Sequence, residues 1–245
     1  MPRLTFSLLS LLIFCIPLLA CATPTNDAQL KSVATALKLS FPQIPLEQVN
    51  STPIEGVYEI VTQKGEILYF APSSGHILAG EIWNNQGQNL TRASKARMMT
   101  DKLAMFPLDQ AIKIGDGPNQ VVEVSDPDCP FCRDGSVFFS AREDVTRYIF
   151  LYPLDKIHPQ AEAKSRFILS AEDQETAYED VFSGEYDNQP LPEFKDNGLL
   201  EAHREIARKV GINSTPRYWI NGQYVSGTKL KEFEKLLDQG PPAQQ

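Results

Sequence analysis

The sequence predicts an α+β fold in which a small antiparallel sheet is followed by a helical linker and a larger domain of mixed strands and helices. Three observations support this prediction. Short β-rich runs separated by turn residues precede residue 85, and strand and helix patterns alternate after residue 113. Between one such strand and the next helix lies a single Cys-x-x-Cys motif. With 245 residues, 42% of them hydrophobic, the chain can bury a core in each part.

The charge of the chain excludes one large class of function. Its formal net charge is -8, and no cluster of lysines and arginines with interleaved aromatic residues offsets it. Nucleic acid and anionic lipid headgroups would repel such a chain. We therefore expect no nucleic-acid partner.

The first residues have the layout of a secretory signal. Arg3 provides a positive start, an apolar run covers residues 8–19, and the small residues Ala20 and Ala22 follow. We expect residues 1–22 to be a signal peptide that directs export of the mature protein.

Two alternatives to soluble export stay open. The apolar run approaches the roughly 20 residues that span a bilayer, so it would also suit an uncleaved anchor. Leu18-Leu19-Ala20-Cys21 resembles a lipoprotein cleavage site at which Cys21 would be lipidated. Leu19 fits that pattern imperfectly, and we prefer soluble export.

Residues 23–85 are predicted to form the small sheet domain, which has no evident catalytic residue. Apolar spacing predicts a helix at its start, and Gly-containing turns separate three β-rich runs. The expected elements are a helix over 27–39 and strands over 57–61, 67–70 and 76–83.

Residues 86–112 are expected to link the two domains through a continuous helix over 91–106. The helix carries methionines at positions 98, 99 and 105. We interpret this stripe as the packed face of the helix, because methionine fills irregular apolar gaps, and we assign it no cofactor role.

Residues 113–245 are predicted to form the larger domain. A buried strand, a turn over 125–128 and a helix that opens with the cysteine motif come first. The expected elements are strands over 120–124 and 148–152, helices over 160–169, 172–182 and 199–210, a hairpin of 217–220 with 223–225, and a last helix over 230–237.

Cys129 and Cys132 are the candidate catalytic residues. Of the four cysteines, Cys15 and Cys21 fall in the expected signal region, so this pair alone remains in the folded part. A disulfide that closes so small a ring removes little entropy from the unfolded chain, which makes chemistry the better reason for the motif. At a helix N-terminus the Cys129 thiolate is stabilised, so Cys129 is the expected nucleophile. Cys132, one turn on, can resolve a mixed disulfide.

Two sequences carry a resemblance to a known family. Cys129-Pro130-Phe131-Cys132 after a strand, and Gly211-Ile212-Asn213-Ser214-Thr215-Pro216 before a hairpin, resemble the thioredoxin fold, in which a cis-proline faces the active-site disulfide. With segments 65–70 and 75–78, the mature chain resembles the periplasmic disulfide isomerases of the DsbC and DsbG type. The resemblance implies a cystatin-like N-terminal dimerisation domain, a linker helix and a thioredoxin-like catalytic domain with a helical insertion.

The same resemblance implies how the protein works. It implies a V-shaped homodimer in the periplasm that binds misfolded exported proteins along an uncharged cleft, with a membrane thiol reductase as electron donor and no cofactor. Cys129 and Cys132 would form the redox-active disulfide, with Thr215 and Pro216 opposite Cys129. Some members carry a second, structural disulfide in the catalytic domain, for which this sequence has no cysteines.

Glu123 is a further candidate that the resemblance brings forward. In thioredoxins an acidic residue six positions before the nucleophilic cysteine lies buried and manages the proton of the second cysteine. A carboxyl buried beside a thiol would have a raised pKa. The alternative is a glutamate that faces solvent, but the neighbouring Val121, Val122 and Val124 are apolar and favour burial.

Other residues invite weaker interpretations. The motif and the scattered His76, His158 and His203 lack the ligand spacing of a zinc site, so we expect no metal. Asp126 and Asp128 flank a proline and are more typical of a turn than of paired catalytic carboxylates.

The predicted activity is that of a disulfide isomerase or reductase with possible chaperone action. A chaperone-like binding module with secondary redox activity is the alternative from another class. Within the enzyme class a dithiol oxidase is the second candidate, because Cys-Pro-x-Cys also occurs in oxidising members of the superfamily. A dimer that shields its active sites from oxidation argues against that role.

Overall fold

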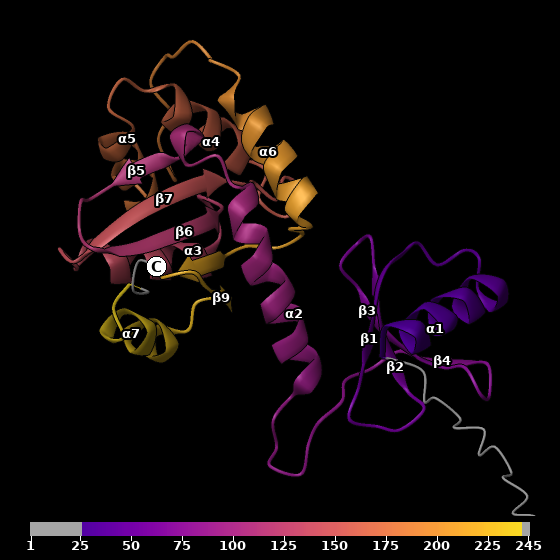
Figure 1. The fold of residues 1–245 in the computed structure, drawn as a ribbon. Coiled ribbons are helices and arrows are strands. Elements are labelled where there is room, and N and C mark those ends of the chain that lie inside the picture. The colour runs from indigo at the N-terminus through magenta and orange to yellow at the C-terminus, as the bar shows by residue number, and fades with distance from the viewer. Residues whose placement is uncertain (1–25, 242–245) are drawn as a thin grey trace, which may run out of the picture.

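The computed structural model describes residues 26–241. The expected signal peptide and Cys21 lie outside the described residues. Figure 1 shows a small N-terminal unit and a larger C-terminal unit joined through helix α2. Both units combine helices with a sheet, so the predicted α+β class is confirmed.

The N-terminal unit is one helix packed on an antiparallel sheet. Val33 and Leu37 of the helix contact Ile60 and Phe70 of the sheet in a small apolar core. The strands lie in the order β1-β2-β3-β4. The elements are α1 (Asn26–Ser40), β1 (Leu46–Ser51), β2 (Tyr58–Thr62), β3 (Ile67–Ala71) and β4 (His76–Leu78).

Two features of this sheet differ from the prediction. β1 was not predicted, because residues such as Glu47 and Asn50, which strands disfavour, lie in an edge strand that has no buried residue. The third predicted strand, expected to reach residue 83, ends at Leu78, and Trp83 makes only an isolated bridge to Asn89.

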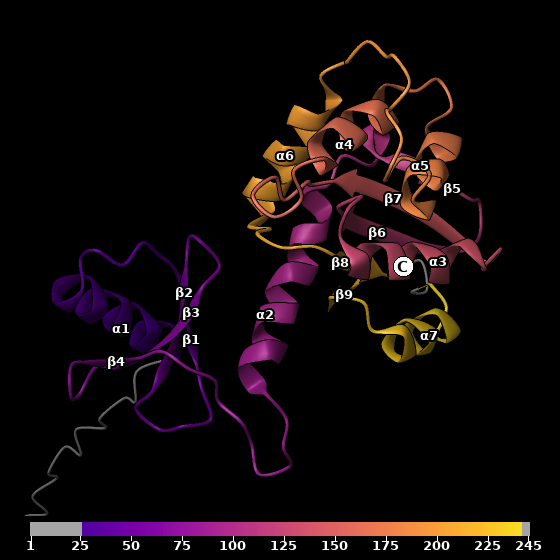
Figure 2. The ribbon, with the colours of Figure 1, turned by 180° about the vertical axis from the view of Figure 1, so that it is seen from behind.

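Helix α2 (Leu90–Asp101) is shorter than predicted and packs on the C-terminal unit, as Figure 2 shows from behind. It continues only as a 3-10 turn, Lys102–Met105, because Phe106 turns into the core and Pro107 disfavours helical backbone before it. The Trp219 Nε1 donates a hydrogen bond of 2.6 Å to the Met99 carbonyl. The methionine stripe is therefore a packed face at Met99, whereas Met105 is exposed.

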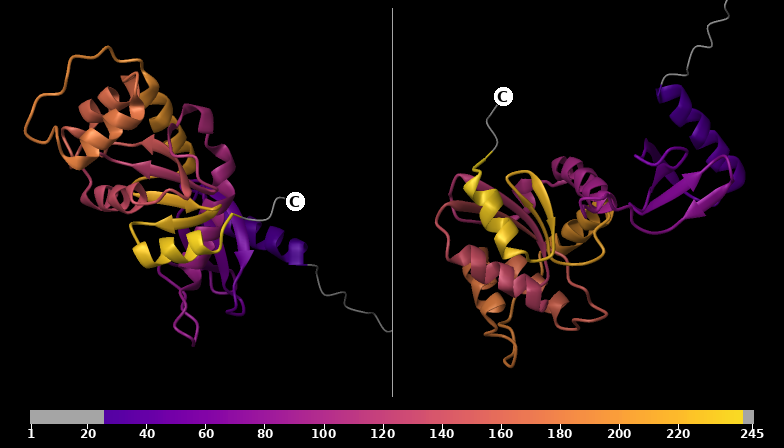
Figure 3. Two further views of the ribbon diagram at one scale, coloured as in Figure 1. Left: turned by 90° about the vertical axis from the view of Figure 1, so that its left-hand side faces the viewer. Right: turned by 90° about the horizontal axis from the view of Figure 1, so that it is seen from below.

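The C-terminal unit is a five-stranded sheet with helices on both faces (Figure 3). The strand order is β5-β7-β6-β8-β9, and β6 and β7 are parallel while the other pairs are antiparallel. The elements are β5 (Ile112–Ile114), β6 (Asn119–Ser125), α3 (Pro130–Ser140), β7 (Val145–Leu151), α4 (Ala161–Ser170), α5 (Gln174–Ser183), α6 (Leu199–Val210), β8 (Arg217–Ile220), β9 (Gln223–Ser226) and α7 (Leu230–Asp238).

Alternate residues of the central strands pack against different helices. Val122 and Val124 of β6 contact α2 and α6, whereas Val121 packs with α3 and α7. This is the alternation expected of a strand covered on both faces. All the predicted helices of this unit are present, but β5 was not predicted, because three residues give too short a pattern. No helix in residues 26–241 has the length and apolar composition that a membrane span needs.

Candidate active site

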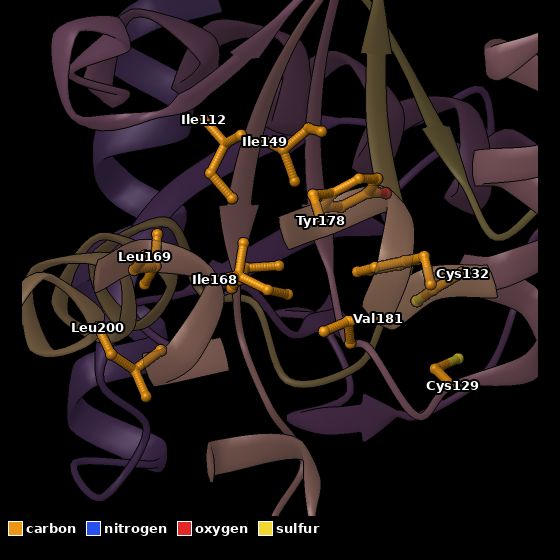
Figure 4. Close-up of a cluster of buried hydrophobic side chains, with 11 residues drawn as sticks. Ile112, Cys129, Cys132, Ile149, Ile168, Leu169, Tyr178, Val181 and Leu200 are labelled. Atoms are coloured by element: carbon orange, nitrogen blue, oxygen red, sulfur yellow. The ribbon is translucent and has the colours of Figure 1, made fainter. Parts of the chain in front are cut away.

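The two candidate cysteines lie where β6 gives way to α3. Cys129 is the N-cap residue of the helix and has extended backbone, and Pro130 occupies the first helical position, where a missing N–H costs little. Cys132 lies one turn further along. Figure 4 shows both side chains at one edge of a cluster of buried apolar residues.

The two thiols are free, and their environments separate their acidities. A hydrogen bond from the Cys132 thiol lowers the pKa of Cys129 to about 6 against the opposing effect of burial, and the backbone N–H groups of Cys132 and Phe131 add to the lowering. Burial raises the pKa of Cys132 well above its ordinary value. Cys129 can therefore be a thiolate near neutral pH while Cys132 keeps its proton.

Thr215 and Pro216 lie in the segment between α6 and β8, which passes beside Cys129. α6 ends at Val210, and the left-handed conformation of its C-cap residue Gly211 turns the backbone toward this segment. The Thr215–Pro216 peptide bond is cis, as the resemblance implied. The Cys129 thiol lies 3.9 Å from the Thr215 carbonyl oxygen, which it faces as a donor. The structure thus brings four of the five predicted site residues together.

Glu123, the fifth predicted residue, lies on the β6 face beneath α3. Its side chain is 1% exposed, so the expected burial is confirmed. The guanidinium of Arg147 donates to Glu123 Oε1 over 2.8 Å, and the Tyr178 hydroxyl donates to the same oxygen over 3.1 Å. The buried carboxyl is therefore paired with a cation, and Glu123→Gln would leave the buried Arg147 charge unpaired.

Asp126 and Asp128 form the turn that the sequence predicted. Asp126 Oδ1 accepts from the Asp128 backbone N–H, and its Oδ2 accepts from the Leu154 N–H and contacts His158 Nδ1 at 2.9 Å. These contacts hold the loop that precedes Cys129.

Sequence reasoning missed five charged or polar residues around the motif. The missed residues are Arg133, Arg147, Lys164, Tyr178 and Asp187. One signal was available, since Arg147 interrupts an otherwise apolar strand pattern as Glu123 does. Nothing in the sequence pairs helix α4 with the turn before Cys129, because that contact depends on how the helical insertion folds back.

The histidines are not grouped around the cysteines. His203 is buried, its Nδ1 accepts from the Leu151 N–H, and burial lowers its pKa to about 4. His76 is exposed on β4. Within residues 26–241, no cluster of three or more His, Cys, Asp or Glu side chains is arranged to hold a metal ion.

Comparison with known proteins adds family evidence. Residues 22–92 match the family described as disulfide bond isomerase protein N-terminal domain, and residues 106–241 match the thioredoxin-like domain family. A "Thiol:disulfide interchange protein DsbC" of Salmonella typhimurium is 22% identical over 78% of this chain and 81% of its own length.

Other relatives align over shorter stretches. A "Probable thiol:disulfide interchange protein DsbC" of Bordetella avium is 28% identical over 61% of this chain, which spans only 52% of that relative. A "Thiol:disulfide interchange protein DsbG" of Pseudomonas aeruginosa is 30% identical over 48% of this chain and 49% of the relative. Among solved structures, a disulfide interchange protein from Neisseria gonorrhoeae is 29% identical, with a TM-score of 0.48 over 55% of this chain and 97% of that one.

Proposed function

We propose that this chain, which belongs to the thioredoxin-like family of thiol-disulfide oxidoreductases, rearranges incorrect disulfides in exported proteins. One observation carries the proposal: a Cys129 thiol whose pKa is lowered to about 6 lies beside a buried Cys132 thiol whose pKa is raised. Cys129 can therefore attack a substrate disulfide as a thiolate, while Cys132 keeps its proton until it resolves the mixed disulfide.

The reaction begins when the Cys129 thiolate attacks one sulfur of a substrate disulfide. That S–S bond breaks, a mixed disulfide between Cys129 and the substrate forms, and the other substrate sulfur leaves as a thiolate. A different substrate thiolate then attacks the mixed disulfide, forms a new substrate disulfide and returns Cys129 as a thiolate. The cycle consumes no electrons, so the cysteine pair stays reduced.

A second outcome is reduction. If no substrate thiol attacks, Cys132 loses its proton and attacks the Cys129 sulfur, which forms the Cys129–Cys132 disulfide and releases the substrate with two thiols. Two electrons have then passed from the protein to the substrate, and a dithiol donor must restore the pair. We propose that a membrane thiol reductase restores the pair in the periplasm. Thr215 and Pro216 have a separate role in this proposal, which is to orient the substrate at Cys129.

Glu123 is the proton acceptor that we propose for Cys132. It lies on the sheet face beneath α3, and Arg147 and Tyr178 fix its carboxylate in place. Glu123→Gln should slow resolution of a trapped Cys129–substrate disulfide about tenfold or more while the first attack keeps its rate. Equal resolution rates in the variant and the parent, from pH 5 to 9, would remove Glu123 from the proton path.

The N-terminal unit supports a homodimer. Residues 22–92 match an isomerase N-terminal domain, and the unit carries no candidate catalytic residue. A fragment that retains only the C-terminal unit must begin before α2, since Met99 and Phe106 belong to its core. We expect a fragment of residues 86–245 to be monomeric, to lose isomerisation and to be oxidised more readily. A dimer in sedimentation of this fragment would contradict the assignment.

A chaperone activity is the second candidate. The N-terminal unit exposes the apolar side chains of Leu39, Ile54 and Leu78, at 80%, 47% and 52%. Exposed apolar side chains can contact the apolar segments of unfolded chains. Assisted refolding of a protein that has no cysteines would support this activity, because thiol chemistry cannot contribute to it.

The decisive experiment is the refolding of a scrambled protein with several disulfides. Cys129→Ser should abolish isomerisation, whereas Cys132→Ser should trap mixed disulfides that are visible on non-reducing gels. Both variants should keep the parent's circular dichroism and oligomeric state. Unchanged isomerisation by Cys129→Ser would overturn the proposal.

A further inference from the structure

Four charged side chains form a closed network directly beside the motif. Lys164 of α4 donates from its Nζ to Asp128 Oδ1 and to Asp187 Oδ1, both at 2.6 Å. Arg133, the residue after Cys132, donates hydrogen bonds from its two terminal nitrogens to the carboxylate of Asp187 at 2.6 and 2.7 Å. It also reaches Asp128 Oδ1 at 3.3 Å. We call these four residues the ion quartet.

The ion quartet joins the helical insertion, which consists of α4, α5 and the segment after α5, to the active-site turn. Asp128 immediately precedes Cys129, and Arg133 donates from its Nε to the Pro127 carbonyl oxygen over 2.7 Å. Lys164 comes from the insertion, and Asp187 follows the insertion helix α5. The insertion therefore reaches the turn that positions the nucleophile.

The charges in the quartet balance, and the balance depends on the insertion. Two carboxylates face two cations, and the Lys164 side chain is only 3% exposed. Arg133 and then Lys164 hold the pKa of Asp187 well below its ordinary range, so its carboxylate is ionised. Without Lys164 one negative charge would be left uncompensated next to Cys129, where it would oppose a thiolate.

We propose that the insertion has a part in the chemistry: Lys164 and Asp187, acting with Arg133, neutralise Asp128 and so set the charge that surrounds the Cys129 thiolate. Lys164 is a positioning residue in this role, since it acts through Asp128. The proposal rests on the proposed function only in taking Cys129 as the attacking residue.

The surroundings favour an electrostatic effect over a packing effect. The quartet lines a cavity of about 440 Å³ together with Ile157 and His158, so water can reach the space that a changed side chain leaves. The other charged groups at this turn are Asp126 and His158, which contact each other at 2.9 Å. Neither of these two residues is changed in the variants described below.

Two single variants should move the reactivity of Cys129 in opposite directions. Lys164→Met leaves the quartet with a net negative charge, and Asp128→Asn leaves it with a net positive charge. In full-length protein with Cys132→Ser as a common background, we expect iodoacetamide alkylation of Cys129 near pH 5.5 to slow about two- to threefold in the first and to speed up by a similar factor in the second. The double variant should return to the parent rate, and Lys164→Arg should keep it.

The controls separate charge from structure. Lys209→Met removes one exposed lysine that pairs with Glu205 on α6, and it should leave the alkylation rate unchanged. A merely structural role for the quartet would move Lys164→Met and Asp128→Asn in the same direction, and that result would overturn the proposal. So would rates within the range of the Lys209→Met control. Alkylation needs no substrate disulfide, so a protein without isomerase activity could still give opposite shifts, and the two proposals fail independently.

Discussion

The two faces of the C-terminal sheet use alternate residues of the same strands, yet they bury different chemistry. The face toward α2 and α6 packs Val122 against Trp219, and burial keeps its histidine, His203, uncharged with a pKa of about 4. The face toward α3 buries Glu123 and Arg147 as an ion pair, with side chains 1% and 4% exposed.

The buried charges thus lie on the face covered by α3, the helix that begins with the cysteine motif. A buried ion pair often stabilises a fold no more than apolar residues of similar size would. The apolar face can therefore account for much of the stability, and the chemical role of the charged face is the one proposed above for Glu123. Each prediction below tests one side of this contrast.

The largest expected effect is on the charged face. Arg147→Met should lower the free energy of unfolding by about 3–5 kcal/mol, because it leaves Glu123 buried without its cation. The double variant Glu123→Gln with Arg147→Met should recover most of that loss. Urea unfolding of the three proteins measures it, and an Arg147→Met variant as stable as the parent would show that this pair carries no such penalty.

On the apolar face, Trp219→Phe should lower the free energy of unfolding by about 2–3 kcal/mol. The change removes the donor to the Met99 carbonyl and opens space in the core. The amides of α2 should also lose protection in hydrogen exchange, since this bond ties the helix to the sheet. If α2 stays protected in the variant, other contacts fix the helix.

His203 gives the apolar face a pH dependence. Its folded pKa of about 4 lies below the unfolded value of about 6.5, so the unfolded chain binds the proton first and stability falls as the pH drops below about 6.5. We expect a loss of about 2 kcal/mol between pH 7 and pH 5. Urea unfolding at the two pH values tests this, with an NMR titration of the ring as the check. A folded His203 that titrates near 6.5 would contradict it.

The smallest effect concerns the packing of α3 on its face. A Cβ at Gly135 would lie 2.0 Å from the Tyr218 hydroxyl oxygen. Gly135→Ala should therefore lower the free energy of unfolding by about 1 kcal/mol, because the clash outweighs the better helix propensity of alanine. Adding Tyr218→Phe should relieve the clash. If the double variant is no more stable than Gly135→Ala, the overlap lies with the aromatic ring or the helix backbone instead.

Local patterns were enough for much of the fold. Alternation and apolar spacing predicted most helices and strands, and the strand, Cys-x-x-Cys and helix order predicted where Cys129 would lie, because these signals depend on near neighbours in the sequence. The edge strands β1 and β5 were missed, since partners supplied by the folded sheet stabilise them. The end of α2 was misplaced for a related reason, as the core captures Phe106.

The sequence by itself predicted a nucleophile at a helix start and a second thiol one turn away, and the resemblance to the thioredoxin fold implied a proline segment opposite them. Only the tertiary structure decided what surrounds that pair. Arg147 meets Glu123 across two strands, and Lys164 meets Asp128 across 36 residues. Contacts between charges so far apart in the chain leave no periodic trace in the sequence, because they depend on how whole elements pack and on the low exposure that makes each charge require a partner.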